Sequence, residues 1–115
     1  MDIRGNRFGA GILVKVLITD GNERAALAVT RALGGEQVEV IVGAESQRSL
    51  AGSSRYCRRS ITYPSPYQEP ERFIATLMEA VQTHRVDALI PLSDIAMHVL
   101  GPEKAQIKKY THFPA

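Results

Sequence analysis

Cysteine is almost absent from this sequence, and long apolar runs are missing altogether. Cys57 is the single cysteine among 115 residues, so an internal disulfide is impossible and the composition fits a reducing compartment. No apolar run approaches the length of a membrane span. The opening residues lack the apolar stretch and small-residue cleavage site of a signal peptide. We therefore expect a cytoplasmic protein that does not contact a membrane.

An excess of charge of one sign is missing too. The chain has 14 Lys and Arg against 12 Asp and Glu, a formal net charge of +2. This surplus is too small to indicate a nucleic-acid partner. The length suits one domain with its own hydrophobic core. Because residues 1–11 contain three glycines, we expect a flexible N-terminal tail there and a single domain over residues 12–115.

Short apolar runs alternate with helical patterns in the first half of the chain. Residues 12–19 and 38–44 are apolar runs typical of buried strands. Between them, apolar side chains recur on one helical face over residues 23–33, and two glycines end the pattern. These three segments predict a βαβ unit with parallel strands.

The second half repeats this alternation after a loop. We expect a short strand at 60–63, a helix from Pro70 to about His84, a strand within 86–94, and short helices over 95–100 and 102–109. The order β-α-β-loop-β-α-β-α predicts a small doubly wound α/β domain with a mostly parallel sheet. Ligands of such sheets bind beyond the carboxyl ends of the strands. The turns expected at that edge are 20–23, 44–48, 63–66 and 93–94.

The turn "TDGNE", residues 19–23, lies where many nucleotide-binding domains hold a phosphate. A dinucleotide fingerprint needs three glycines, but Glu23 and Ala26 occupy the second and third positions. The Walker pattern is absent from the whole sequence. Two interpretations stay open: a capped turn with Asn22 as the helix N-cap, or a turn in which Asp20 and Asn22 contact a polar ligand.

No complete catalytic set can be assembled from the remaining polar residues. Segment 45–60 has four arginines against one glutamate, which fits either an anion-binding loop or a solvated one. Cys57 has no histidine near it in sequence, and the three histidines lack metal-ligand spacing, so we expect a buried or half-buried thiol and structural histidines. Ser93 and Asp94, between a strand and a helix, fit a helix cap, a ligand contact, or both.

Several segments together resemble the N-terminal domain of ATP-grasp ligases, and more narrowly the carbamoyl-phosphate-synthase-like members. They are "TDGNERAAL" after the first strand, "SRYC" after the second strand, and "DALIPLSD" before a short helix. The resemblance covers Val14 to about Ala115. It implies a Rossmann-like pre-ATP-grasp domain that shapes the acceptor-substrate side of a ligase.

The family activity is the ATP-dependent joining of a carboxylate to an amine or thiol through an acyl phosphate. The resemblance implies that ATP and magnesium are held by further domains expected after residue 115, so the chain alone would be inactive. Its partners would be those domains and a small-molecule carboxylate or amine. Family position implies that seven residues bind substrate: Asp20, Gly21, Asn22, Glu23, Arg55, Ser93 and Asp94. It implies no catalytic and no metal-ligating residue in this chain.

Two alternatives remain beside the ligase hypothesis. One is a stand-alone nucleotide- or cofactor-binding Rossmann domain, which the missing glycines disfavour. The other is a non-enzymatic ligand-sensing module. A domain separated from its neighbours is expected to expose an apolar patch, for which segment 95–110 is the candidate. We therefore predict dimerisation of this chain through that segment.

Overall fold

The computed structural model describes residues 13–114, so the tail predicted over residues 1–11 lies outside the described part of the chain. The elements, in chain order, are β1 (Val14–Ile18), α1 (Arg24–Leu33), β2 (Val38–Ala44), β3 (Cys57–Thr62), α2 (Pro70–His84), β4 (Ala88–Ile90), α3 (Asp94–Leu100), η2 (Gly101–Glu103) and α4 (Lys104–Ile107).

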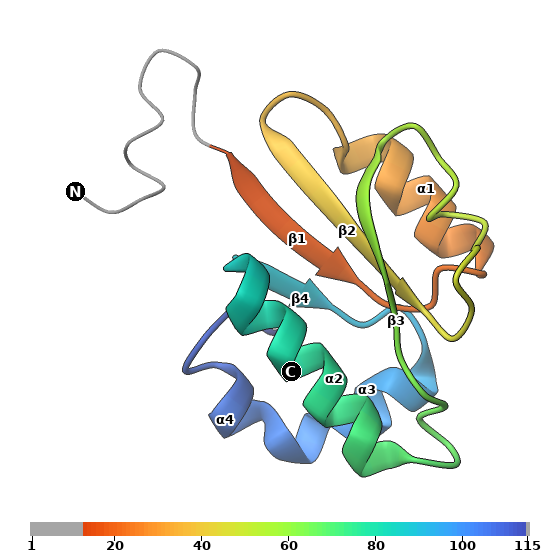
Figure 1. The fold of residues 1–115 in the computed structure, drawn as a ribbon. Coiled ribbons are helices and arrows are strands. Elements are labelled where there is room, and N and C mark those ends of the chain that lie inside the picture. The colour runs from red at the N-terminus through yellow and green to blue at the C-terminus, as the bar shows by residue number, and fades with distance from the viewer. Residues whose placement is uncertain (1–12, 115) are drawn as a thin grey trace.

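The four strands form one parallel sheet with the order β3-β2-β1-β4 (Figure 1). The chain winds outward from β1 through β2 to β3, then crosses back and adds β4 on the other side of β1. β1 is paired on both sides: Val16, for example, pairs with Val40 of β2 and with Ala88 of β4. The predicted α/β class with a doubly wound, parallel sheet is therefore confirmed.

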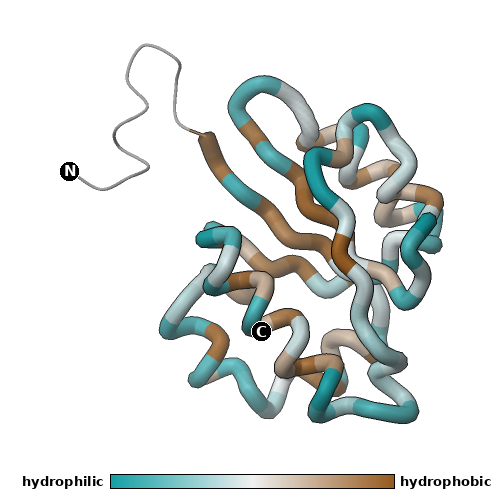
Figure 2. Tube along the Cα trace, in the orientation of Figure 1, coloured by the Kyte–Doolittle hydropathy of each residue, from teal (hydrophilic) through white to brown (hydrophobic). Residues whose placement is uncertain are grey.

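Helices cover both faces of the sheet, with α1 on one face and α2, α3 and α4 on the other (Figure 1). Side chains of successive strand residues alternate between these faces. Leu17 and Ile41 pack in the cluster with Phe73 of α2, whereas Val16 and Val40 pack in the cluster on the α1 side. The hydropathy of the trace accordingly peaks along β1 and β2, inside the sandwich (Figure 2).

Three expected boundaries differ from those of the structure. The third strand begins at Cys57 and not at Ser60, inside a stretch that the sequence assigned to a loop. The strand expected within 86–94 is only Ala88–Ile90 long, because Pro91 has no N–H for the ladder. The helix expected over 102–109 is divided into η2 and the four-residue α4.

The residue that precedes α1 also differs from the prediction. Glu23, not Asn22, is the N-cap, and its side chain makes no capping hydrogen bond. The Asn22 side chain instead reaches the loop after β2, where its amide donates to Ser46 Oγ over 3.2 Å and its oxygen accepts from the Leu50 N–H over 3.4 Å. Asn22 therefore joins two loops of the same sheet edge.

No helix within residues 13–114 is long and apolar enough to cross a membrane.

Candidate functional site

The turns after β1 and β2 meet the residue after β3 around one pocket at the carboxyl edge of the sheet. The pocket has a volume of about 300 Å³. Its lining consists of Asp20, Gly21, Asn22, Glu23, Ala44, Glu45 and Tyr63. All four residues of the predicted turn 20–23 thus line a single cavity, at the edge where parallel sheets bind their ligands.

Asp20, just after the carboxyl end of β1, is held in an unusual backbone conformation. Its φ is 63°, in the left-handed region that non-glycine residues seldom adopt. Its N–H donates to the Tyr63 hydroxyl over 2.8 Å, and the Thr19 hydroxyl donates to its carboxylate. Thr19 is fully buried, and its Oγ1 also accepts from the Leu92 N–H over 2.9 Å. These bonds hold the backbone and the carboxylate of Asp20 at the carboxyl end of β1.

Tyr63 forms the buried wall of the pocket. Its side chain is 4% exposed, and its ring meets Phe73 edge to face with centroids 4.7 Å apart. Burial raises the pKa of the Tyr63 hydroxyl; the hydrogen bond from the Asp20 N–H lowers it, and the nearby carboxylates of Asp20 and Glu45 raise it again. The phenol therefore stays protonated and keeps a hydrogen to donate.

Gly21 allows the turn after β1 to pack closely against its neighbours. Its N–H donates to the Gly43 carbonyl over 3.0 Å, and its own carbonyl accepts from the Ala51 N–H over 2.8 Å. A Cβ at position 21 would lie 2.6 Å from Ser49 Oγ and 2.7 Å from a Val42 methyl. Any larger residue at position 21 would therefore clash with its neighbours.

The charged residues that line the pocket are all acidic. Asp20, Glu23 and Glu45 contribute three carboxylates, and none of the seven lining residues is Lys or Arg. Within residues 13–114, no ion pair joins any of the three to a basic side chain. The same part of the chain contains no group of three His, Cys, Asp or Glu residues that could hold a metal ion. An anion would be repelled here, and a cation attracted.

Ser93 and Asp94 lie at the same edge of the sheet but outside the pocket lining. Ser93 is the N-cap of α3, and its hydroxyl accepts from the Ala96 N–H over 3.2 Å. Asp94 is exposed in the first turn of α3, where a negative charge complements the helix dipole. The capping interpretation of Ser93 is confirmed, and a ligand contact by either residue stays a prediction.

Arg55 is not brought together with the other predicted site residues. It precedes β3, at the amino edge of the sheet. Its guanidinium lies over the Tyr56 ring, 5.0 Å from the centroid, and donates to the Tyr56 hydroxyl over 2.9 Å. Its predicted substrate contact would therefore belong to a different site from that of Asp20.

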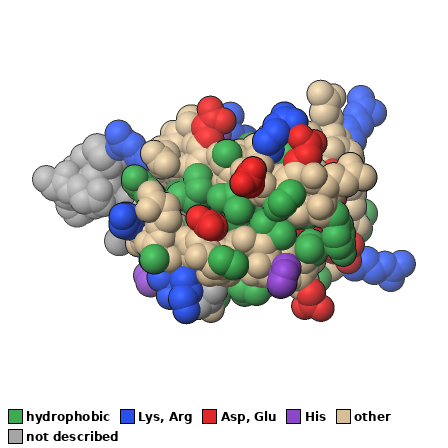
Figure 3. Space-filling view, turned by 90° about the horizontal axis from the view of Figure 1, so that it is seen from below, with side chains coloured by type: hydrophobic (Ala, Val, Ile, Leu, Met, Phe, Trp, Pro, Cys, Tyr) green, Lys and Arg blue, Asp and Glu red, His purple; other side chains and the backbone are tan. Residues whose placement is uncertain are grey.

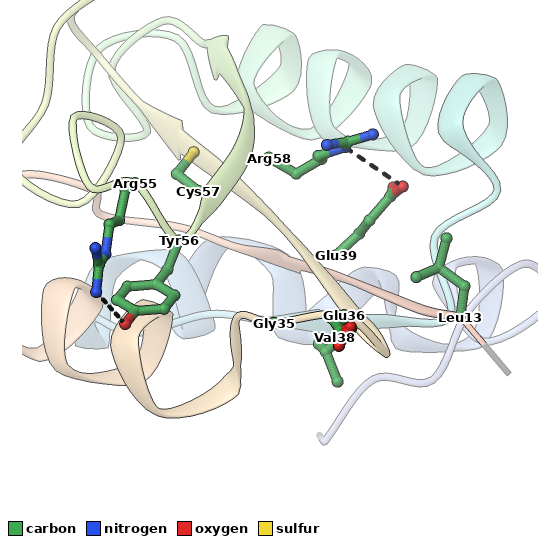
Figure 4. Close-up of a pocket in the computed structure, with 9 residues that line it drawn as sticks. All are labelled: Leu13, Gly35, Glu36, Val38, Glu39, Arg55, Tyr56, Cys57 and Arg58. Atoms are coloured by element: carbon green, nitrogen blue, oxygen red, sulfur yellow. Dashed lines mark hydrogen bonds and ion pairs between the residues drawn. The ribbon is translucent and has the colours of Figure 1, made fainter. Parts of the chain in front are cut away.

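A larger hollow of about 580 Å³ surrounds the start of β3, but its side chains do not converge (Figure 4). Arg55 and Tyr56 lie on the α1 side of the strand. Arg58 and Glu39 point toward α2, where they form an ion pair of 3.7 Å. The half-buried Cys57 thiol donates to the Arg59 carbonyl instead of facing these groups. The smaller carboxyl-edge pocket is therefore the better candidate site.

Sequence reasoning missed three lining residues, Ala44, Glu45 and Tyr63. All three lie in turns that the sequence placed at the carboxyl edge, 44–48 and 63–66. That placement was the available signal, but nothing local showed that the side chains face Asp20.

No protein-family model matches the chain, and no curated protein matches it either.

Proposed function

We propose that this chain is the substrate-side, pre-ATP-grasp domain of a carbamoyl-phosphate-synthase-like ATP-grasp ligase. The observation that carries the proposal is the pocket around "TDGNE". It lies at the carboxyl edge of the sheet, beside the ends of β1, β2 and β3, and its chemistry does not suit a phosphate. The order of the segments that resemble the family supports the same conclusion.

A dinucleotide-binding role fits this pocket poorly. Pyrophosphate binding needs free helix N–H groups and a close glycine backbone. Glu23 is the N-cap of α1, so its negative charge lies beside the place of the phosphates. Ala26, at the third glycine position, is fully buried in the core. A doubly wound sheet holds a dinucleotide where the chain reverses its winding, which here lies between β1 and β4. The hydrogen bond from the Leu92 N–H to Thr19 Oγ1 connects the residues just after these two strands at that place.

The chain's own part in the ligase reaction would be to bind and orient one substrate. The Asp20 carboxylate and the Tyr63 hydroxyl are held by neighbouring bonds, so they can position a ligand without rearrangement. ATP and magnesium, bound by the following domains, supply phosphoryl transfer to a carboxylate. The acceptor held at the carboxyl edge would then give up a proton and attack the carbonyl carbon of the acyl phosphate, and inorganic phosphate would leave.

The first test is calorimetry on the 115-residue chain, with magnesium–ATP and with oxidised dinucleotide in parallel. We expect binding of neither. Tight binding of the dinucleotide would show that the ligase proposal is wrong and that "TDGNE" is a cofactor turn.

The second test is genetic and enzymatic. The coding sequence after residue 115 is expected to encode the two ATP-binding domains of an ATP-grasp ligase. A polypeptide that includes them is expected to release ADP and phosphate when given magnesium–ATP, a carboxylate and an amine. A stop codon directly after residue 115 would contradict the proposal.

A further inference from the structure

We propose that the carboxyl-edge pocket binds a small molecule with a primary ammonium group next to a hydroxyl or carbonyl oxygen. The inference names the substrate class of the site in the proposed function and rests on that function for calling the ligand an acceptor substrate. The cavity of about 300 Å³ lies at the small end of ligand pockets, which suits a compact ligand.

The preference for a cation follows from the unneutralised carboxylates of the lining. Asp20, Glu23 and Glu45 line the same cavity, and no Lys or Arg is among its lining residues. Charge-assisted hydrogen bonds from an ammonium group to such carboxylates are stronger than those between neutral groups. Because the described residues contain no three-ligand metal group, an organic ammonium fits better than a metal ion held by protein ligands.

Asp20 is the carboxylate best prepared for this contact. The Thr19 hydroxyl binds one of its oxygens, Oδ2, and the Tyr63 hydroxyl holds its backbone N–H. Among residues 13–114, no hydrogen-bond donor reaches the other oxygen, Oδ1. An ammonium group in the pocket would supply that donor without moving the carboxylate.

The need for a neighbouring oxygen on the ligand comes from Tyr63, independently of the charges. The Tyr63 hydroxyl accepts from the Asp20 N–H, but no acceptor in the described part of the chain takes its own hydrogen. The side chain is 96% buried, being 4% exposed, and lines the cavity. A ligand oxygen in the cavity would give this hydrogen an acceptor, and such a hydrogen bond would be favourable.

The experiment is an NMR titration of the 115-residue chain with four small probes at constant ionic strength. Ethanolamine has both groups, ethylamine lacks the oxygen, ethylene glycol lacks the charge, and glycolate has the opposite charge. We expect ethanolamine to cause saturable shifts at the amides of Gly21, Glu45 and Tyr63. We expect roughly fivefold weaker binding of ethylamine, and no saturable shifts with the other two.

Two substitutions separate the charge from the hydroxyl. Glu45→Gln is expected to weaken ethanolamine binding roughly threefold, as loss of an exposed ion pair would. Tyr63→Phe, which keeps the ring on Phe73, is expected to reduce ethanolamine to the affinity of ethylamine. The matched control is Glu103→Gln, an exposed glutamate outside the pocket, which should change nothing.

Equal binding of ethanolamine and ethylene glycol would overturn the inference, and so would unchanged binding in Glu45→Gln. If Tyr63→Phe fails to fold, the comparison of ethanolamine with ethylamine on the unsubstituted chain still tests the oxygen. The proposed function is tested separately. Failed amine binding with ATP-grasp domains encoded downstream rejects only the inference, whereas amine binding without such domains rejects only the ligase.

Discussion

Gly21 lies where the turn after β1 packs against β2 and the following loop. A methyl group there would collide with Ser49 and Val42. We expect Gly21→Ala to lower the free energy of unfolding by about 1–3 kcal/mol, the usual cost of overpacking. Urea denaturation measures it. Gly35→Ala is the control, because a Cβ at Gly35 meets no atom within 4 Å. Equal losses in both variants would show that steric contact is not the cause.

Residue roles at this site could be predicted only in part from the sequence. The turn 20–23 was recognisable because aspartate, glycine and asparagine follow an apolar run. Asn22 was expected to cap the helix that follows, which is its commonest local role. Its actual partners, Ser46 and Leu50, are 24 and 28 residues away. Tyr63 bonds to Asp20 across 43 residues. Such pairs depend on the sheet order, which local patterns do not contain.

At the scale of elements, α3 depends on a single side-chain cap. The Ser93 hydroxyl accepts from the Ala96 N–H and so satisfies one of the free donors of the first turn. We expect Ser93→Ala to lower the free energy of unfolding by about 1 kcal/mol. Ser93→Thr keeps a hydroxyl and should lose much less. Thermal or urea unfolding compares them, and an unchanged stability in Ser93→Ala would show that the cap contributes nothing.

The elements most visible in the sequence are those that bury a regular face. The apolar stripe of α2 and the apolar runs of β1 and β2 were found, because burial requires periodic hydrophobic residues. Most residues of β3 are exposed at the sheet edge, so arginine and serine are tolerated and the pattern disappears. Its register with β2 also shifts between Val40 and Ile41, which breaks the alternation further.

For the whole molecule, the predicted dimer through segment 95–110 can be tested at one side chain. In the face that carries α2, α3 and α4, hydrophobic side chains lie among charged ones (Figure 3). Leu100 and Ile107 are buried, and Tyr110 is 48% exposed. If the dimer forms, Tyr110→Lys should raise its dissociation constant about tenfold or more. Tyr67→Lys, at an exposed tyrosine outside the segment, is the control. A monomer at high concentration in sedimentation velocity would contradict the dimer.

Alkaline pH is expected to destabilise the whole fold through Tyr63. Its pKa in the folded chain is raised above the ordinary value of 10.0, chiefly by burial. Below pH 10 the hydroxyl is protonated in both states, so this contribution to stability is complete. Above it the unfolded chain releases the proton while the folded chain keeps it. The free energy of unfolding should therefore fall, by up to about 1.4 kcal/mol per pH unit.

Tyr63→Phe isolates this alkaline contribution. The variant is expected to be less stable at neutral pH, because the Asp20 N–H loses its acceptor. It should nevertheless lose less stability than the unsubstituted chain between about pH 9 and about pH 11. Urea denaturation across that range measures the two slopes, with Tyr67→Phe as the control at an exposed tyrosine. Parallel slopes for Tyr63→Phe and the unsubstituted chain would mean that the Tyr63 hydroxyl ionises as readily folded as unfolded. The hydroxyl would still be protonated at neutral pH, because neutral pH lies well below the ordinary value of 10.0, so this result would contradict only the alkaline contribution to stability.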